Sequence, residues 1–107
     1  MLPLNYASLS DITGGDAELE GQLLSLYCAT TERCLGRLQT LVHQDTEGHW
    51  HRVAHELKGA SNNIRAEKMA ALCKQIEHLP PDPEERAIAC EHLAAAYAEL
   101  KTAIGRV

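Results

Sequence analysis

The sequence predicts an all-α fold, an antiparallel up-down-up-down four-helix bundle with a short N-terminal helix. Apolar residues recur at spacings of three and four over four long stretches, as on the buried face of a helix. The connections between these stretches are short, which makes successive helices antiparallel neighbours. Alanine and leucine abound and phenylalanine is absent, a composition that suits closely packed helices. At 107 residues the chain is expected to form one domain over residues 1–107.

The first half of the chain predicts a short helix and a long one. Residues 4–12 form the short amphipathic piece, and the Thr-Gly-Gly-Asp run at 13–16 is a break in which Asp16 can cap the next helix. The long helix runs from Asp16 to about His43. Its expected inward residues are Leu19, Leu23, Leu26, Tyr27, Thr30, Cys34, Leu38, Leu41 and Val42.

Two more helix boundaries follow from capping residues and prolines. Asp45 or Thr46 can cap the helix that follows the short connection, and that helix ends near residues 62–65, where Asn63 can adopt the left-handed conformation. The next helix is expected over residues 66–79, before Pro80 and Pro81. Its expected inward residues are Met69, Leu72, Cys73, Ile76 and Leu79.

The last helix has a strong start signal. Asp82 is the expected N-cap, Pro83 suits the first helical position, and Glu85 can close a capping box. This helix runs nearly to the end of the chain. Its expected inward residues are Ile88, Leu93, Ala94, Tyr97, Leu100 and Ile104.

Residues 50–64 carry the pattern that points to chemistry. On a helical wheel, one side collects the apolar stripe Trp50, Val53, Ala54, Leu57, Ser61 and Ile64. His55 points about 150° away from the centre of that stripe, so it should face solvent. Gly59 lies one turn further on, where an interior glycine costs about 1 kcal/mol relative to alanine. A glycine that clears space beside an exposed imidazole suggests that a partner must approach the imidazole closely.

The motifs of this region resemble those of the histidine phosphotransfer (HPt) family of bacterial and fungal phosphorelays. That family has His-x-Leu-Lys-Gly, a glycine six residues later, and Leu-x-x-Cys-x-x-Leu-Glu on the next helix. The chain has His55-Glu56-Leu57-Lys58-Gly59, followed by Leu72-Cys73 and Ile76-Glu77. It departs from the pattern at Arg65, where the second glycine would stand.

The resemblance implies a function and a partner. His55 would be the phosphoacceptor, and Glu77 would lie near it and could orient its ring. The partner would be a receiver (response-regulator) domain, whose aspartate donates or accepts the phosphoryl group and which supplies Mg²⁺. The chain itself would need no cofactor. Such domains occur free-standing and as the last domain of hybrid sensor kinases.

Elementary chemistry supports the same reading of the exposed histidine. A neutral imidazole is nucleophilic near neutral pH, and its distal nitrogen, Nε2, projects furthest from the backbone. Lys58 can reach phosphate oxygens as a mobile charge, while Asn62 and His51 could hydrogen-bond there. Ser61 lies on the buried side and receives no role. The chain lacks a glycine-rich phosphate loop, so it is not expected to be an ATP-dependent kinase.

Two other functions are compatible with parts of the pattern. His51 and His55 have the i, i+4 spacing of metal ligands, but the third and fourth ligands of a zinc site are missing. The chain could also be a plain helical interaction module without phosphoryl transfer. Such a module would tolerate replacement of His55 and Gly59, whereas a relay protein would not.

Composition limits the partners and the location. Net charge is −5 with both signs mixed along the chain, so no basic stripe indicates nucleic-acid binding. No apolar run is long enough to span a membrane and no signal peptide is visible, so a cytoplasmic protein is expected. The four cysteines form no Cys-x-x-Cys pair and are expected to be reduced thiols in the core. A monomer is expected, because docking needs a free His55 face.

Overall fold

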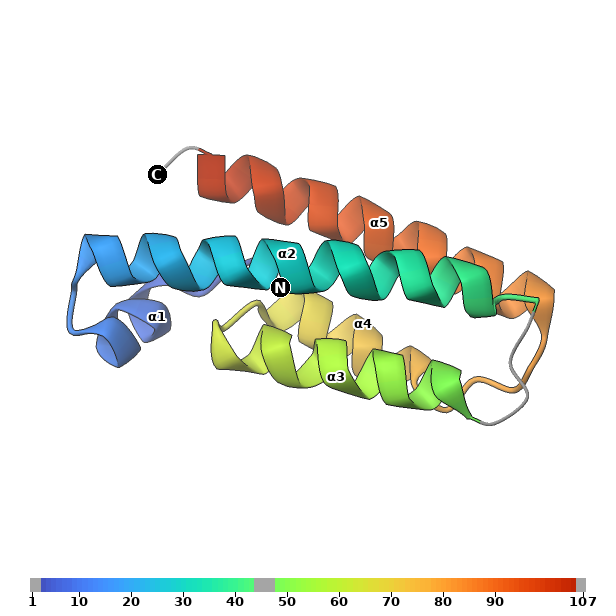
Figure 1. The fold of residues 1–107 in the computed structure, drawn as a ribbon. Coiled ribbons are helices and arrows are strands. Elements are labelled where there is room, and N and C mark those ends of the chain that lie inside the picture. The colour runs from blue at the N-terminus through green and yellow to red at the C-terminus, as the bar shows by residue number, and fades with distance from the viewer. Residues whose placement is uncertain (1–2, 44–47, 106–107) are drawn as a thin grey trace.

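The computed structural model describes residues 3–43 and 48–105, and it confirms the predicted bundle with a short helix in front. The helices are α1 (Tyr6–Thr13), α2 (Ala17–Leu41), α3 (His49–Asn63), α4 (Glu67–Ile76) and α5 (Pro83–Gly105). Figure 1 shows α2 to α5 running alternately in opposite directions, with α3 and α4 below α2 and α5 above it. Helix α3 packs against α2 and α4, α5 closes the bundle against the same two helices, and α1 packs on α2.

The caps of the first two helices follow the sequence signals. The Asn5 side chain accepts from the backbone N–H of Ser8 at 3.1 Å, and Gly14 ends α1 in the left-handed conformation. Asp16 caps α2 as predicted, with its carboxylate accepting from the N–H of Leu19 at 3.1 Å. Each cap satisfies an N–H that the first turn leaves unpaired.

The ends of α3 differ from the prediction. Asp45 and Thr46, the predicted caps, lie outside the described residues, and Gly48 occupies the N-cap position with φ of 71°. At the other end Asn63 is still helical, and Arg65 adopts the left-handed conformation with φ of 62°. The prediction for Asn63 was wrong because the helix continues through it. The departure from the family pattern is therefore an arginine in a backbone conformation that favours glycine.

Helix α4 is shorter than predicted, and α5 lacks the predicted capping box. Helix α4 ends at Ile76, and one further turn precedes the prolines. The Asp82 carboxylate accepts from the N–H of Glu84 at 2.9 Å, as expected of an N-cap. The Asp82 N–H, however, donates to the carbonyl of Pro80 at 2.7 Å, so it is not available to Glu85.

The core contains the whole apolar stripe of α3 and most of the other predicted positions. Trp50, Ala54 and Leu57 are almost completely buried. On α2 and α5 the periodicity placed some residues wrongly: Leu19, Leu26, Ile88 and Ala94 are exposed. On these two helices the buried positions missing from the prediction are Leu24, Thr31, Arg86, Ala89, Cys90 and Ala96. Helix α2 contacts three neighbours and α5 contacts two, so their buried faces are wide and a helical wheel does not fix the centre of each face.

Arg86 is a buried cation that the sequence did not indicate. Its guanidinium donates to the carbonyls of Leu41 at 3.3 Å, Leu79 at 3.4 Å and Pro80 at 3.1 Å, and it lies 4.8 Å from the centre of the Trp50 ring. These bonds satisfy one carbonyl group at the end of α2 and two in the connection between α4 and α5. Arg86 therefore ties three helices together at one end of the bundle.

All four cysteines are free thiols, as predicted. Cys34, Cys73 and Cys90 are buried and Cys28 is partly buried. Burial raises the pKa of Cys73 to about 12, so this thiol stays protonated and unreactive at neutral pH.

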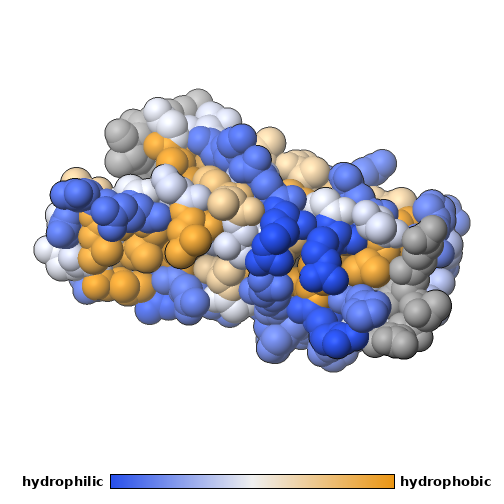
Figure 2. All heavy atoms as spheres, in the orientation of Figure 1, coloured by the Kyte–Doolittle hydropathy of each residue, from blue (hydrophilic) through white to orange (hydrophobic). Residues whose placement is uncertain are grey.

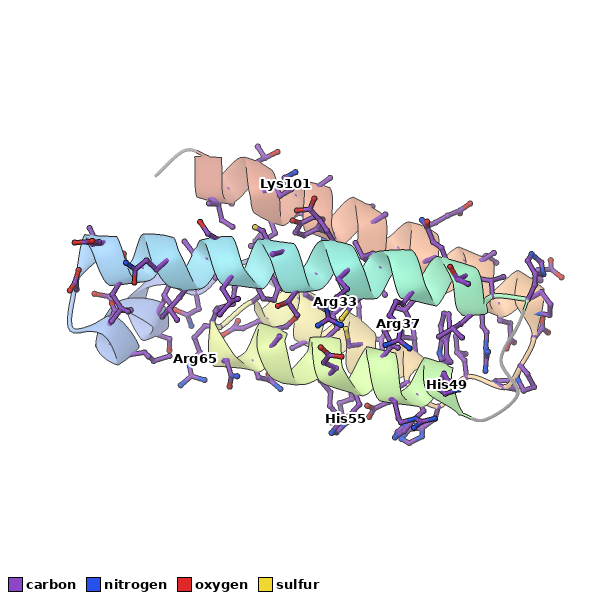
Figure 3. All side chains as sticks on the ribbon, viewed as in Figure 1. Arg33, Arg37, His49, His55, Arg65 and Lys101 are labelled. Atoms are coloured by element: carbon purple, nitrogen blue, oxygen red, sulfur yellow. The ribbon has the colours of Figure 1, made fainter. Side chains whose placement is uncertain are left out.

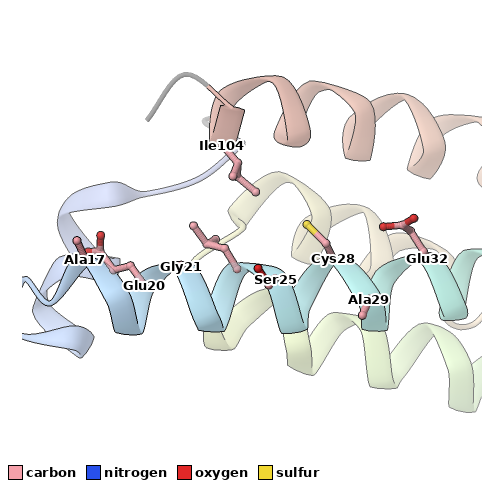
Figure 4. A pocket seen from close by; sticks show the side chains of 9 residues that line it. Ala17, Glu20, Gly21, Ser25, Cys28, Ala29, Glu32 and Ile104 are labelled. Carbon is pink, nitrogen blue, oxygen red and sulfur yellow. The ribbon is translucent and has the colours of Figure 1, made fainter.

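The surface has two features away from α3. Figure 2 shows an apolar area over α1 and the first half of α2, where Ile12, Leu19 and Leu26 are exposed. A groove of about 790 Å³ lies between α2 and the last turn of α5 (Figure 4). Among its lining residues are Ala17, Gly21, Ser25, Ala29 and Ile104. Within the described ranges, no helix has both the length and the hydrophobicity needed to cross a bilayer.

Replacing Arg65 with glycine should stabilise the protein. A side chain in the left-handed conformation costs about 1 kcal/mol, which glycine avoids. We expect Arg65→Gly to raise the free energy of unfolding by about 0.5–1 kcal/mol in urea titrations. Arg65→Ala is the control, because it removes the same guanidinium but keeps the strained backbone, and it should bring no gain. If Arg65→Gly and Arg65→Ala had the same free energy of unfolding, the backbone at Arg65 would not be strained.

Candidate functional site

His55 lies on the outer side of α3, as the periodicity predicts, and its side chain is 64% exposed. Figure 3 shows its ring pointing away from the bundle. Its Nδ1 atom lies 3.2 Å from Oε2 of Glu77, a carboxylate that is only 7% exposed. A buried acid thus holds one nitrogen of an exposed imidazole.

Glu77 is the first residue after α4, and its carboxylate has two partners on α3. Oε1 accepts from Nζ of Lys58 at 2.8 Å, while Oε2 faces His55. The hydrogen bond from Lys58 lowers the pKa of Glu77, burial opposes this, and the bond to His55 lowers it further. Glu77 is therefore ionised at neutral pH.

An ionised carboxylate fixes the tautomer of the neutral His55 ring. A carboxylate without a proton can only accept hydrogen bonds, so Nδ1 of His55 must carry the hydrogen. The lone pair of the neutral ring is then on Nε2, the nitrogen on the solvent side. This arrangement presents a nucleophile outward and holds a proton inward.

The backbone around Glu77 is held by side chains of α3. The indole Nε1 of Trp50 donates to the carbonyl of Ile76 at 2.8 Å, and His51 Nδ1 lies 3.1 Å from the carbonyl of Glu77. These are carbonyls at the C-terminus of α4, which have no partner within their own helix. On the opposite side of α3, Ser61 shares a buried 2.7 Å hydrogen bond with Tyr27 of α2. Helix α3 is thus fixed to both neighbours beside the site.

His78 is a neighbour of the site that the sequence analysis missed. Its ring is stacked on that of His51 at 4.8 Å, and the His51 ring lies 5.8 Å from that of His55. Nε2 of His78 is 3.6 Å from Oε1 of Glu77. Its position directly after Glu77 was the available signal, but α4 had been predicted to end at Leu79, three residues beyond its end at Ile76.

Lys58, Gly59 and Asn62 lie in the same region with different roles. Lys58 is 22% exposed, and its ammonium is paired with Glu77 rather than extended into solvent. A Cβ atom added at Gly59 would meet nothing within 4 Å, so packing within the chain does not require this glycine. Asn62 is exposed and lines a hollow of about 330 Å³ together with Lys58 and Lys74, a second cation that the sequence analysis did not single out.

The alternative metal site gains no third ligand. Across residues 3–43 and 48–105, no group of three His, Cys, Asp or Glu side chains could hold a metal ion. His51 and His55 each direct Nδ1 to Glu77 instead.

The comparison with known families agrees with this geometry. Residues 22–107 match the family model described as the Hpt domain. No match was found among curated proteins or among solved structures. Members of this family are phosphotransfer modules of phosphorelays that interact with receiver domains, and are not kinases themselves. The match covers most of the chain, including every site residue described above, and the protein therefore belongs to the Hpt domain family.

Proposed function

We propose that His55 accepts a phosphoryl group on Nε2 from the phospho-aspartate of one receiver domain and passes it to the aspartate of another. The observation that carries the proposal is the contact between Nδ1 of His55 and the ionised, buried carboxylate of Glu77. In the neutral ring it leaves the Nε2 lone pair free on the solvent side, where a partner can approach.

The step balances without a further reactant. The Nε2 lone pair forms a bond to phosphorus while the bond between phosphorus and the aspartyl oxygen breaks, and the aspartate leaves as a carboxylate. The proton on Nδ1 stays in place, so the phosphorylated ring is cationic. The Glu77 carboxylate, 3.2 Å away, compensates that charge and orients the ring for in-line attack.

The other residues of the site support this step. Lys58 keeps Glu77 ionised, and its ammonium has further donors that can face the phosphoryl oxygens. His51 holds the carbonyl of Glu77, and Asn62 can donate to a phosphoryl oxygen from its exposed position. Mg²⁺ bound by the receiver would neutralise charge on the phosphoryl group.

The setting of the reaction is part of the proposal. The chain acts as a monomeric relay intermediate in the cytoplasm, with receivers on both sides of the transfer. It takes no phosphate directly from ATP. The open space around Gly59 gives the receiver room beside His55. A relay within a hybrid sensor kinase and a relay by a separate protein would use the same face.

A helical interaction module is the second candidate, favoured by the groove between α2 and α5. The groove is lined by α2 and α5, and no residue of the His55 site contributes to it. Binding there would leave the buried Glu77 beside an exposed histidine without a purpose. Phosphoryl transfer explains both, so it is the function supported best.

Replacing His55 should abolish phosphorylation and leave the fold intact. His55→Gln removes the nucleophile from an exposed position, so circular dichroism and thermal unfolding should match the parent. Incubation with a panel of phosphorylated receiver domains should label the parent with acid-labile, base-stable phosphate and leave the variant unlabelled. His51→Gln is the control and should still be labelled. Label on His55→Gln would contradict the assignment.

Replacing Gly59 should stabilise the fold while it hinders the access of a receiver to His55. Gly59→Gln should raise the free energy of unfolding by about 0.5 kcal/mol, because glutamine suits a helix better than glycine. It should also slow transfer at least about tenfold by filling the space beside His55. Gly36→Gln is a matched control, since this glycine is also helical, exposed and open. It should gain similar stability without loss of transfer; equal transfer rates in the two variants would refute the steric role.

The ionisation of Glu77 should appear in the pH dependence of stability. Folding lowers the Glu77 pKa, so ionisation stabilises the fold above the ordinary glutamate value of about 4.3. This contribution is lost as the pH falls through the lowered value. We expect Glu77→Gln to destabilise the protein more at pH 6 than at pH 3 in urea titrations. A difference from the parent that is the same at both pH values would contradict an ionised Glu77.

A further inference from the structure

The two signs of charge are not evenly mixed along the chain, in contrast to the interpretation from composition. Residues 1–32 contain five acidic residues and no lysine or arginine. Residues 33–74, which include the second half of α2, all of α3 and most of α4, contain only four acidic residues. The seven cations of this segment are Arg33, Arg37, Arg52, Lys58, Arg65, Lys68 and Lys74. The segment that carries His55 is therefore cationic within an acidic protein.

Several of these cations flank His55 along the seam between α2 and α3. Figure 3 shows Arg33 and Arg37 at that seam, Arg65 at the end of α3, and Lys101 on α5 at the opposite edge. Arg33 forms an ion pair with Glu56, the residue next to His55. Figure 2 shows the corresponding hydrophilic area over the middle of α2 and α3. Because the two helices are antiparallel, Arg37 lies about one turn from the level of His55, and Arg65 lies about 15 Å away on the other side.

Arg65 is a second, independent indication that charge matters at this surface. Its φ of 62° would suit glycine, and an arginine there costs about 1 kcal/mol. The side chain is exposed, and its guanidinium donates to the carbonyl of Asn62 at 3.1 Å. The donor is charged, but the bond is exposed to water and replaces hydration of the guanidinium, so it offsets only part of this cost. An exposed arginine in a strained backbone conformation indicates that its side chain serves binding and not the stability of the fold.

The chemistry of the donor specifies an acidic partner surface. A receiver that transfers a phosphoryl group to His55 must present its phospho-aspartate and the Mg²⁺ that assists it. Protein sites hold Mg²⁺ with carboxylates, so the surface that meets His55 carries several negative charges. A cationic surface around the acceptor would attract that surface and orient it. The distance of about 20 Å from Arg37 to Arg65 fits one partner of a standard interface.

We propose that Arg37 and Arg65, with the Arg33–Glu56 ion pair between them, form a cationic docking surface that steers the acidic active face of a receiver onto His55. This inference rests on the proposed phosphotransfer function and assigns its partner recognition to the α2–α3 side of His55. The α3–α4 side, with Lys58 and Glu77, then serves the reaction itself. Docking on the α2–α3 side brings the receiver over Gly59.

The test is the salt dependence of transfer from a receiver that labels the parent. Arg37→Gln and Arg65→Gly each remove one charge from the docking surface. Each should lower kcat/KM about threefold in about 20 mM salt and less than about 1.5-fold in about 0.5 M salt, with kcat unchanged. Lys101→Gln is the matched control on α5 and should leave kcat/KM within about 1.5-fold at both salt concentrations. Because Arg65→Gly should be more stable than the parent, a loss of transfer there does not reflect unfolding.

Failure of this proposal and failure of the proposed function give different results. If no receiver labels the parent, phosphotransfer at His55 is contradicted. If the parent is labelled and all three charge variants keep the same kcat/KM and salt dependence, only the docking surface is refuted. An equal loss of kcat/KM in Lys101→Gln would also refute the docking surface. It would show that transfer depends on the net charge of the protein and not on where the charge lies. Calorimetric titration of receivers against His55→Gln carrying the same charge variants measures docking without transfer.

Discussion

The site depends on how the end of α4 is held against α3. The carbonyls of Ile76 and Glu77 lie at the end of α4, and Trp50 and His51 of α3 contact one each; the Ile76 carbonyl also accepts from the N–H of Leu79. The Trp50 ring is in turn covered by the buried guanidinium of Arg86. Because these contacts fix the backbone of Glu77, its carboxylate reaches His55 without help from a flexible loop. The position of the proton on the imidazole is thus determined by the same bonds that close the bundle.

Lys58 serves the same arrangement through charge. A carboxylate as buried as that of Glu77 would otherwise take up a proton more readily, because burial disfavours the charged form. The 2.8 Å bond to Lys58 is the largest influence in the opposite direction. The ammonium expected to approach phosphate from solvent therefore first maintains the ionisation of Glu77. Loss of Lys58 would disturb both the His55 tautomer and the proposed contact between the ammonium and the phosphoryl oxygens. A single substitution of Lys58 therefore does not separate these two effects.

The sequence predicted the parts of this site that depend on a single helix. The stripe from Trp50 to Ile64 fixed which side of α3 is buried, and it placed His55 in solvent and Ser61 in the core. The neighbourhood of Glu77 came from the family resemblance, since nothing on α4 alone indicates what its last turn contacts. Arg86 and His78 were missed because their partners lie on other helices, and a helical wheel contains no such information. The left-handed conformation was predicted at Asn63 because asparagine tolerates it better than arginine does. Helix α3 continues through Asn63, however, and the residue with the left-handed conformation is Arg65.

Gly59 and Arg65 depart from local preference in opposite directions. A glycine occupies a helical position that favours almost any other residue, and an arginine occupies a left-handed position that favours glycine. Packing explains neither choice, because a Cβ at Gly59 would meet no atom and Arg65 is exposed. Both residues follow His55 in the chain, Gly59 within α3 and Arg65 just beyond its end; the first has no side chain and the second has a long cationic one. The proposed docking of a receiver would account for both departures, since close approach to His55 needs the glycine and attraction of an acidic partner needs the charge.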